Sequence, residues 1–163
     1  MIAAALFVSR HQTHQCTQPS SIITALEARS GGSRWTKEAT LQDISVGVDI
    51  IEIGRVAQTL ERFGDRFLQR VFTEGEIAYC RGRAPQLAAR FAAKEAVMKA
   101  LGTGTRGIGW REVEITRKRT GEPGIALHGR AVARAEKLGI DRLALSISHS
   151  RHYAVASVVS RVI

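Results

Sequence analysis

Residues 90–104 read RFAAKEAVMKALGTG, and this stretch is the strongest structural signal in the chain. Its helix formers follow Pro85, which suits a first helical turn, and they stop at Gly102, so the pattern predicts one long helix. The segment is otherwise built from small and apolar residues, but it carries four charges, at Arg90, Lys94, Glu95 and Lys99. The alanines between these charges permit close packing, so the charges are candidates for contacts with another element.

The four charges are spaced so that they form pairs on the helix surface. Glu95 lies beside Lys99, and Arg90 beside Lys94, because residues four apart share a helix face. Such pairs are common on solvated helices, and that interpretation stays open. Arg90 and Lys94 are both positive, however, which costs stability unless an anion lies between or above them. A bound anion is therefore the alternative interpretation.

The sequence around this helix mixes strands and helices. A β-branched run at 46–53 predicts a strand that leads into a short helix at 55–63, and Thr73 with Glu76 forms a capping box that opens another helix. After the long helix we expect strands at 110–118 and 125–128, a helix at 129–139, and strands at 142–150 and 153–159. Strands and helices do not alternate regularly, so we predict an α+β domain with a mainly antiparallel sheet.

The chain divides into two regions by composition. Residues 1–45 are polar and lack periodicity, which predicts a disordered N-terminal extension before a domain at 46–163. The 163 residues carry a net charge of +9, and +8 of it belongs to residues 46–163. A basic domain predicts an anionic partner, such as a phosphorylated metabolite, an acidic protein or nucleic acid.

Hydropathy and cysteine usage predict a soluble cytoplasmic protein. No apolar run approaches the roughly 20 residues that span a bilayer, so we expect no membrane association. Cys16 and Cys80 are the only cysteines, and without C-x-x-C spacing they indicate neither a disulfide framework nor a thiolate zinc site.

Asp49 is unusual because it interrupts the apolar strand VGVDII. An unpaired carboxylate would be costly there if it were buried. It is either an edge residue whose carboxylate reaches water or, together with Glu95, a ligand of a magnesium ion. Magnesium is commonly held by one or two carboxylates, substrate phosphates and water.

Two further motifs are ambiguous. GTGTRG at 102–107 matches G-x-G-x-x-G in letters, but a helix precedes it and a strand follows, so no dinucleotide site is predicted. It is either a helix cap or a loop that approaches a phosphate. Ser148 and His149 are neighbours in a predicted strand and point to opposite faces, which disfavours a Ser-His nucleophile. His149 is then either a histidine whose hydrogen bonds are satisfied within the protein or a candidate phosphate contact.

Six stretches of the chain together resemble the holo-(acyl-carrier-protein) synthase family of small 4'-phosphopantetheinyl transferases. They occur in the family's order and approximate spacing: VGVDIIEIGRV, FTEGEIAYC, RFAAKEAVMKALGTG, GWREVEI, GEPGIALHGRA and LSISHS. The resemblance implies the fold of that family for residues 46–163. It also implies transfer of the phosphopantetheine arm of coenzyme A to a serine of apo acyl carrier protein, in fatty acid biosynthesis.

The resemblance implies roles for individual residues. Asp49 and Glu95 would hold magnesium, and Lys99 would neutralise the leaving group. Arg55 would grip the acidic carrier protein. Contacts with coenzyme A would come from Arg90, Lys94, Gly102, Thr103, Gly104 and His149. Family members resemble compact trimers, so we expect a homotrimer whose active sites are shared between subunits.

Two other functions compete with the transferase. A basic nucleic-acid-binding module would use the same positive charge, but it leaves Asp49 and Glu95 without a reason. A coenzyme A-binding module without catalysis is disfavoured by the presence of Asp49, Glu95 and Lys99. We therefore expect an enzyme that has no nucleic-acid partner.

Overall fold

The computed structural model describes residues 44–163, apart from the side chains of Thr105 and Arg106. The extension predicted for residues 1–45 thus lies almost wholly outside the described residues. The first strand already begins at Ile44, two residues before the predicted start of the domain.

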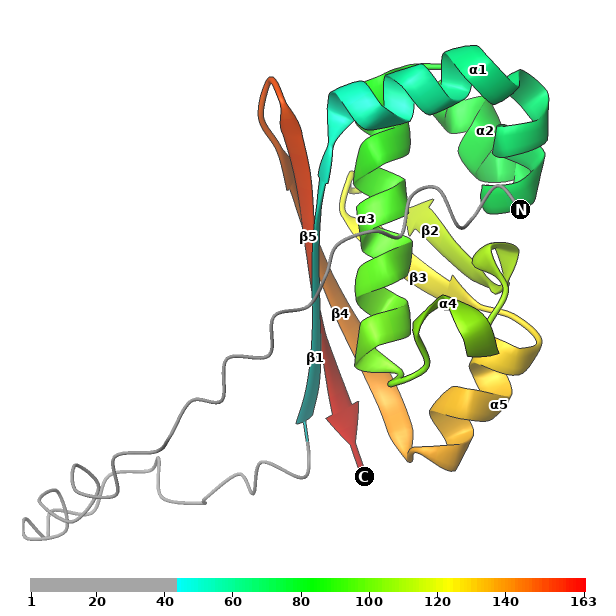
Figure 1. The fold of residues 1–163 in the computed structure, drawn as a ribbon. Coiled ribbons are helices and arrows are strands. Elements are labelled where there is room, and N and C mark those ends of the chain that lie inside the picture. The colour runs from blue at the N-terminus through cyan, green and yellow to red at the C-terminus, as the bar shows by residue number, and fades with distance from the viewer. Residues whose placement is uncertain (1–43) are drawn as a thin grey trace, which may run out of the picture. The chain divides into compact units, whose positions relative to one another are not determined.

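Three antiparallel strands form the main sheet (Figure 1). They are β1 (Ile44–Glu52), β4 (Ile140–His149) and β5 (Tyr153–Val162), in the order β1-β5-β4. A second sheet is the antiparallel hairpin of β2 (Val113–Arg117) and β3 (Pro123–Leu127). The predicted α+β class with antiparallel pairing is confirmed. The strand predicted from residue 110 begins only at Val113, because residues 110–112 form a 3-10 turn.

The helices are α1 (Ile53–Val71), α2 (Glu74–Cys80), α3 (Ala84–Ala100), α4 (Gly104–Gly107) and α5 (Arg130–Lys137). The capping box predicted at the start of α2 is present, since Thr73 and Glu76 bond each other's backbone amides. The helix predicted at 55–63 is longer than expected. It resumes beyond a kink at Gly64, whose φ of 49° interrupts the helical geometry.

Helix α3 is the centre of the domain. It lies between the main sheet and the β2–β3 hairpin, with α1 and α2 near its N-terminal end (Figure 1). Because neighbours surround it, 12 of its 17 residues are buried, including the alanines at 88, 92, 93 and 96. The boundaries expected from Pro85 and Gly102 are confirmed.

Gly47 allows β1 to lie directly on α3. A Cβ atom there would be 1.9 Å from the carbonyl oxygen of Ala96 and 2.8 Å from the amide nitrogen of Ala100. Both are backbone atoms that cannot rotate away, so Gly47→Ala is expected to destabilise the protein by at least about 3 kcal/mol. Chemical unfolding measures this loss.

Gly54→Ala is the matched control for Gly47→Ala. Nothing lies within 4 Å of a Cβ atom at Gly54, in the first turn of α1. This substitution should be neutral or should stabilise the protein by up to about 1 kcal/mol, because alanine favours a helix. Equal stabilities of the two variants would contradict the close approach of strand and helix.

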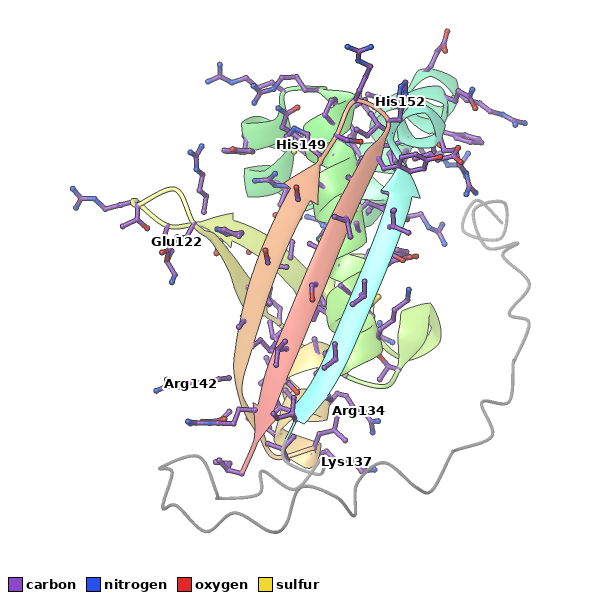
Figure 2. The ribbon with its side chains drawn as sticks, turned by 90° about the vertical axis from the view of Figure 1, so that its left-hand side faces the viewer. Glu122, Arg134, Lys137, Arg142, His149 and His152 are labelled. Atoms are coloured by element: carbon purple, nitrogen blue, oxygen red, sulfur yellow. The ribbon has the colours of Figure 1, made fainter. Side chains whose placement is uncertain are left out.

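The two faces of the main sheet differ. Odd-numbered residues of β1, such as Asp49 and Ile51, are buried toward α3, whereas the even-numbered residues are exposed. Figure 2 shows the side away from α3, which we call the outer sheet face. Its exposed apolar residues are Ile44, Val46, Val48, Ile50, Tyr153, Val155 and Val159.

Among the described helices, none is long and apolar enough to cross a membrane.

Candidate functional site

Asp49, Glu95 and Lys99 form a group that we call the carboxylate cluster. Asp49 is only 9% exposed, on the inner face of β1. The Lys99 ammonium donates hydrogen bonds of 2.9 Å to Asp49 Oδ1 and of 2.9 Å to the carbonyl oxygen of Val48. The structure therefore brings together a strand residue and two helix residues that lie about 50 positions apart in the sequence.

Glu95 is strongly affected by this environment. Burial, and then the charge and hydrogen bond of the neighbouring Asp49 carboxyl, raise the pKa of Glu95 to about 7. The charges of Lys99 and Arg55 act in the opposite direction on this pKa, so Arg55 is close enough to influence the cluster. Two carboxyl groups are thus crowded around one partly exposed ammonium, an arrangement that a cation would stabilise.

The carboxylate cluster contributes two side chains of a type that binds metal ions, those of Asp49 and Glu95. Among residues 44–163, no three histidine, cysteine, aspartate or glutamate side chains gather closely enough to hold a metal ion by themselves. A complete structural metal site is therefore absent from this part of the chain. Two carboxylates still suit magnesium, which takes the rest of its oxygen ligands from water and substrate phosphates.

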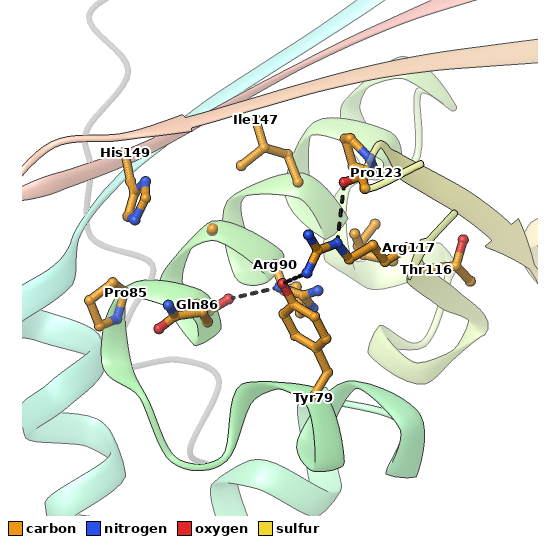
Figure 3. Close-up of a pocket in the computed structure, with 12 residues that line it drawn as sticks. Tyr79, Pro85, Gln86, Arg90, Thr116, Arg117, Pro123, Ile147 and His149 are labelled. Atoms are coloured by element: carbon orange, nitrogen blue, oxygen red, sulfur yellow. Dashed lines mark hydrogen bonds between the residues drawn. The ribbon is translucent and has the colours of Figure 1, made fainter. Parts of the chain in front are cut away.

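A second feature is a cavity of about 350 Å³ between α2, α3, the β2–β3 hairpin and β4 (Figure 3). Arg90 and His149, both expected to contact coenzyme A, line it together with Arg117 of β2. Its other polar lining residues include Tyr79 and Gln86, and none of the lining residues from 44–163 is acidic. We call this cavity the basic pocket. Its charge fits an anionic ligand.

Arg90 is held in the wall of the basic pocket. Its guanidinium carbon lies 4.0 Å from the centre of the Tyr79 ring, and the residue is 8% exposed. Arg90 Nε and Gln86 Oε1 are buried, and neither has a hydrogen-bond partner in the described part of the chain. Unpaired buried polar atoms are costly, so they mark a place where a ligand would be stabilising.

The carboxylate cluster and the basic pocket lie on different sides of α3. Asp49 of β1 and Ile147 of β4 are both paired with Ala156 of β5, so one strand separates them. Helix α3 covers the inner face of the sheet between the cluster and the pocket. Within one chain, the site residues predicted from sequence therefore form two groups.

Lys94, which was expected to contact coenzyme A, joins neither group within one chain. Its ammonium is fully buried and lies 2.8 Å from Glu76 Oε2. It also donates hydrogen bonds to the backbone carbonyls of Trp110 and Val113. Burial lowers the pKa of Lys94, and the Glu76 carboxylate opposes that shift. The anion expected beside Lys94 is thus a side chain of the protein.

The turn at Gly102–Gly104 closes the C-terminal end of α3. The amide of Gly102 bonds the carbonyl oxygen of Lys99, and the amide of Thr103 bonds that of Met98. Of the two interpretations of this motif, the helix cap is the one that these bonds support. The amides of Gly102 and Thr103 are therefore already paired, and the turn lies at the opposite end of α3 from Arg90.

Sequence reasoning missed two residues of the basic pocket, Tyr79 and Arg117. Arg117 Nη1 donates a 3.0 Å hydrogen bond to the Tyr79 hydroxyl, and its guanidinium carbon lies 5.6 Å from the ring centre. The tyrosine lies within the FTEGEIAYC stretch, but a short helix gives no sign of which side chain faces a cavity. For Arg117, the sequence offered only the alternation of side chains along β2, which limits Arg117 to one of two sheet faces.

The fold and the site define a small α+β domain with a carboxylate cluster on one side of its central helix and a basic pocket on the other. Residues 45–157 match the family model described as the 4'-phosphopantetheinyl transferase superfamily. The chain belongs to this superfamily, which confirms the resemblance seen in its motifs.

Two relatives show how close the similarity is. The chain is 50% identical over 120 residues to the holo-[acyl-carrier-protein] synthase of Koribacter versatilis, covering 71% of this chain and 96% of the relative. It is 52% identical over 117 residues to the enzyme of the same name from Gloeobacter violaceus, covering 69% and 89%. The similarity thus extends over nearly the whole of these relatives.

A solved structure supports the fold. The crystal structure of Helicobacter pylori holo-[acyl-carrier-protein] synthase in complex with coenzyme A matches with a TM-score of 0.65 at 32% identity. The match covers 71% of this chain and 98% of that one. The predicted fold of the 4'-phosphopantetheinyl transferase type is therefore confirmed.

Proposed function

We propose that this chain transfers the 4'-phosphopantetheine group of coenzyme A to a serine of apo acyl carrier protein. The serine oxygen forms a bond to the phosphorus that carries pantetheine, the pyrophosphate bond breaks, and adenosine 3',5'-bisphosphate leaves. The observation that carries the proposal is the carboxylate cluster, in a chain that is 50% identical to a holo-[acyl-carrier-protein] synthase over 71% of its length.

Asp49 and Glu95 are proposed to hold magnesium. Burial, and then the neighbouring Asp49 carboxyl, raise the pKa of Glu95, and a divalent cation between the two carboxyls would relieve both effects, so the donor set fits such an ion. Bound there, the ion supplies charge neutralisation at the pyrophosphate of coenzyme A. Asp49 also accepts a hydrogen bond from the Lys99 ammonium, which would orient that ammonium toward the same phosphates.

Lys99 is proposed to act on the leaving group. Its side chain is 47% exposed, so the ammonium is accessible to a substrate even though one of its hydrogen bonds goes to Asp49. Negative charge grows on the leaving phosphate as the pyrophosphate bond breaks, and a fixed ammonium stabilises that charge.

The basic pocket is proposed to receive phosphate-bearing parts of coenzyme A through Arg90 and His149. Arg90 lines the pocket, and its buried Nε has no hydrogen-bond partner within residues 44–163, whereas His149 lies at the rim, at the end of β4 (Figures 2 and 3). The Gly102–Gly104 turn is a weaker candidate, because two of its amides are used in capping α3.

The protein is proposed to be a homotrimer with shared active sites, as the family resemblance implies. Two features of the chain support this assembly. The outer sheet face exposes an apolar surface that another copy would cover. The carboxylate cluster and the basic pocket also lie on opposite sides of α3, so a site that combines the two groups would be completed by a neighbouring copy.

The substrates also define the proposed setting. Acyl carrier protein serves fatty acid biosynthesis, and we place the enzyme in the cytoplasm, where coenzyme A and the carrier are available. The exposed arginines of α1 suit an acidic carrier protein, with Arg55 next to the carboxylate cluster.

Mass spectrometry tests the proposed reaction directly. Apo acyl carrier protein incubated with the protein, coenzyme A and magnesium should gain the mass of one phosphopantetheine group on its serine. A serine-to-alanine carrier should gain nothing. An unmodified wild-type carrier, with a melting curve showing folded enzyme, would contradict the proposed function.

Arg55→Glu tests the carrier-protein contact. Repulsion would replace attraction toward an acidic carrier, so the apparent KM for the carrier should rise by about tenfold or more. The KM for coenzyme A should change little, because the phosphate contacts remain. Arg119→Glu makes the same charge change in the exposed β2–β3 turn and is the control. Equal carrier KM values for the two variants would contradict the role of Arg55.

A further inference from the structure

The basic pocket contains an arrangement of like charges that the fold alone does not explain. Arg90 and Arg117 come from different elements, yet both guanidiniums contact one aromatic ring, that of Tyr79. Among the described residues, no carboxylate lines the pocket. Two positive groups gathered without an anion cost energy, and the electron-rich face of a ring offsets this cost only in part.

Tyr79 holds the two arginines in different ways. Its ring supports Arg90 at 4.0 Å, whereas its hydroxyl accepts a 3.0 Å hydrogen bond from Arg117 Nη1. Arg117 is also bonded through Nε to the carbonyl oxygen of Gly121, at 3.3 Å, which fixes its other side (Figure 3). Within the part of the chain that the structure describes, Arg117 Nη2 makes no hydrogen bond, so it is available for a ligand in the cavity.

We propose that Tyr79 is a positioning residue that arranges Arg90 and Arg117 as a paired-arginine clamp for a phosphate group of the substrate. This inference rests on the proposed function, because the substrate that it names is coenzyme A. Arg117 thereby joins Arg90 as a ligand-binding residue, and Tyr79 acts through both of them. A phosphate is the fitting anion, because guanidinium groups bind its oxygens through paired, charge-assisted hydrogen bonds.

Three variants separate the parts of the clamp. Arg117→Ala removes one guanidinium, Tyr79→Phe removes the hydroxyl that orients it, and Tyr79→Leu also removes the ring beneath Arg90. The control is Arg119→Ala, which deletes the same charge two residues away in the exposed turn. Calorimetry of coenzyme A binding, without magnesium or carrier protein, gives the dissociation constants, and steady-state transfer gives KM and kcat.

Arg117→Ala is expected to weaken coenzyme A binding by about tenfold or more, as loss of one charge-assisted hydrogen bond requires. Tyr79→Phe should weaken it severalfold, and Tyr79→Leu more than Tyr79→Phe. In each case KM for coenzyme A should rise more than kcat falls, since the clamp binds a part of the substrate away from the carboxylate cluster. Arg119→Ala should bind like the unaltered protein.

The double variant Tyr79→Phe/Arg117→Ala tests whether the hydroxyl acts through Arg117. It should bind coenzyme A no more weakly than Arg117→Ala alone, because the hydroxyl then has no guanidinium to orient. If the losses of coenzyme A affinity in the two single variants multiplied in the double variant, the positioning role of Tyr79 would be overturned. If Arg117→Ala bound coenzyme A as tightly as Arg119→Ala does, the clamp itself would be overturned. If Tyr79→Leu does not fold, these comparisons still decide the matter. Failure of the unaltered protein to bind coenzyme A would instead contradict the proposed function.

Discussion

Glu95→Gln is expected to lower the rate of transfer by about a hundredfold or more without lowering the melting temperature of the metal-free protein. The substitution removes one of the two charges proposed to hold magnesium. The metal contributes several kcal/mol to phosphoryl transfer, and each 1.4 kcal/mol is about tenfold in rate. The side chain keeps nearly the same shape, so packing around α3 is retained.

The expected melting temperature follows from the burial of Glu95 beside the Asp49 carboxyl. Its raised pKa, about 7, shows that the folded protein disfavours the charged carboxylate there. Replacing that carboxylate with a neutral amide should therefore leave the melting temperature unchanged or raise it. Asp49→Asn should lose transfer in the same way, although it also weakens the hydrogen bond from Lys99.

The expected loss of transfer is measured as turnover at limiting magnesium, and the expected stability is measured by thermal melting without metal. Glu136→Gln, on the exposed side of α5, makes the same chemical change away from the cluster and should keep full activity. If Glu95→Gln retained near-native turnover at limiting magnesium, Glu95 would not be a metal ligand.

If the proposed trimer is correct, Val46→Asp is expected to convert it into monomers and to remove most of the transfer activity. Val46 is 59% exposed on the outer sheet face, so a carboxylate there is harmless to a solvated monomer. In a trimer that buries this face the same carboxylate would be unpaired in an apolar contact, which costs several kcal/mol in each subunit. Activity should fall because a shared site needs both neighbours.

Sedimentation velocity and the transfer assay, run at the same protein concentration, test this expectation. Val132→Asp is the matched control, since Val132 is an exposed valine of α5 away from the outer sheet face, at 37% exposure. A Val46→Asp protein that is monomeric and fully active would contradict the shared site. One that remains trimeric would show that subunits associate through another surface.

The parts of the fold that local chemistry determines were predictable from the sequence. Pro85 and Gly102 marked the ends of α3, and the capping box at Thr73 and Glu76 marked the start of α2. The kink at Gly64 was not anticipated, because glycine only permits a positive φ and the neighbouring elements decide whether it is used.

Only one part of the candidate site, the carboxylate cluster, was predictable from the sequence. Asp49 was conspicuous as a charge in an apolar strand, and strand and helix do bring it to Glu95 and Lys99. The position of Lys94 was not predictable, since Glu76 is 18 positions away and their pairing depends on how α2 packs on α3. The division of the site residues between two sides of α3 likewise depends on tertiary packing.

The buried pair of Lys94 and Glu76 changes how mutational data on this helix should be understood. Lys94 and Glu95 are adjacent letters of one motif, and a survey scored by cell growth would reject substitutions at both. Lys94 would be intolerant because a lone Glu76 carboxylate in the core unfolds the protein, whereas Glu95 would be intolerant although the protein accumulates normally. A measurement of protein abundance would distinguish the two positions, because only the Lys94 variants would be depleted. The sequence motif alone does not distinguish them.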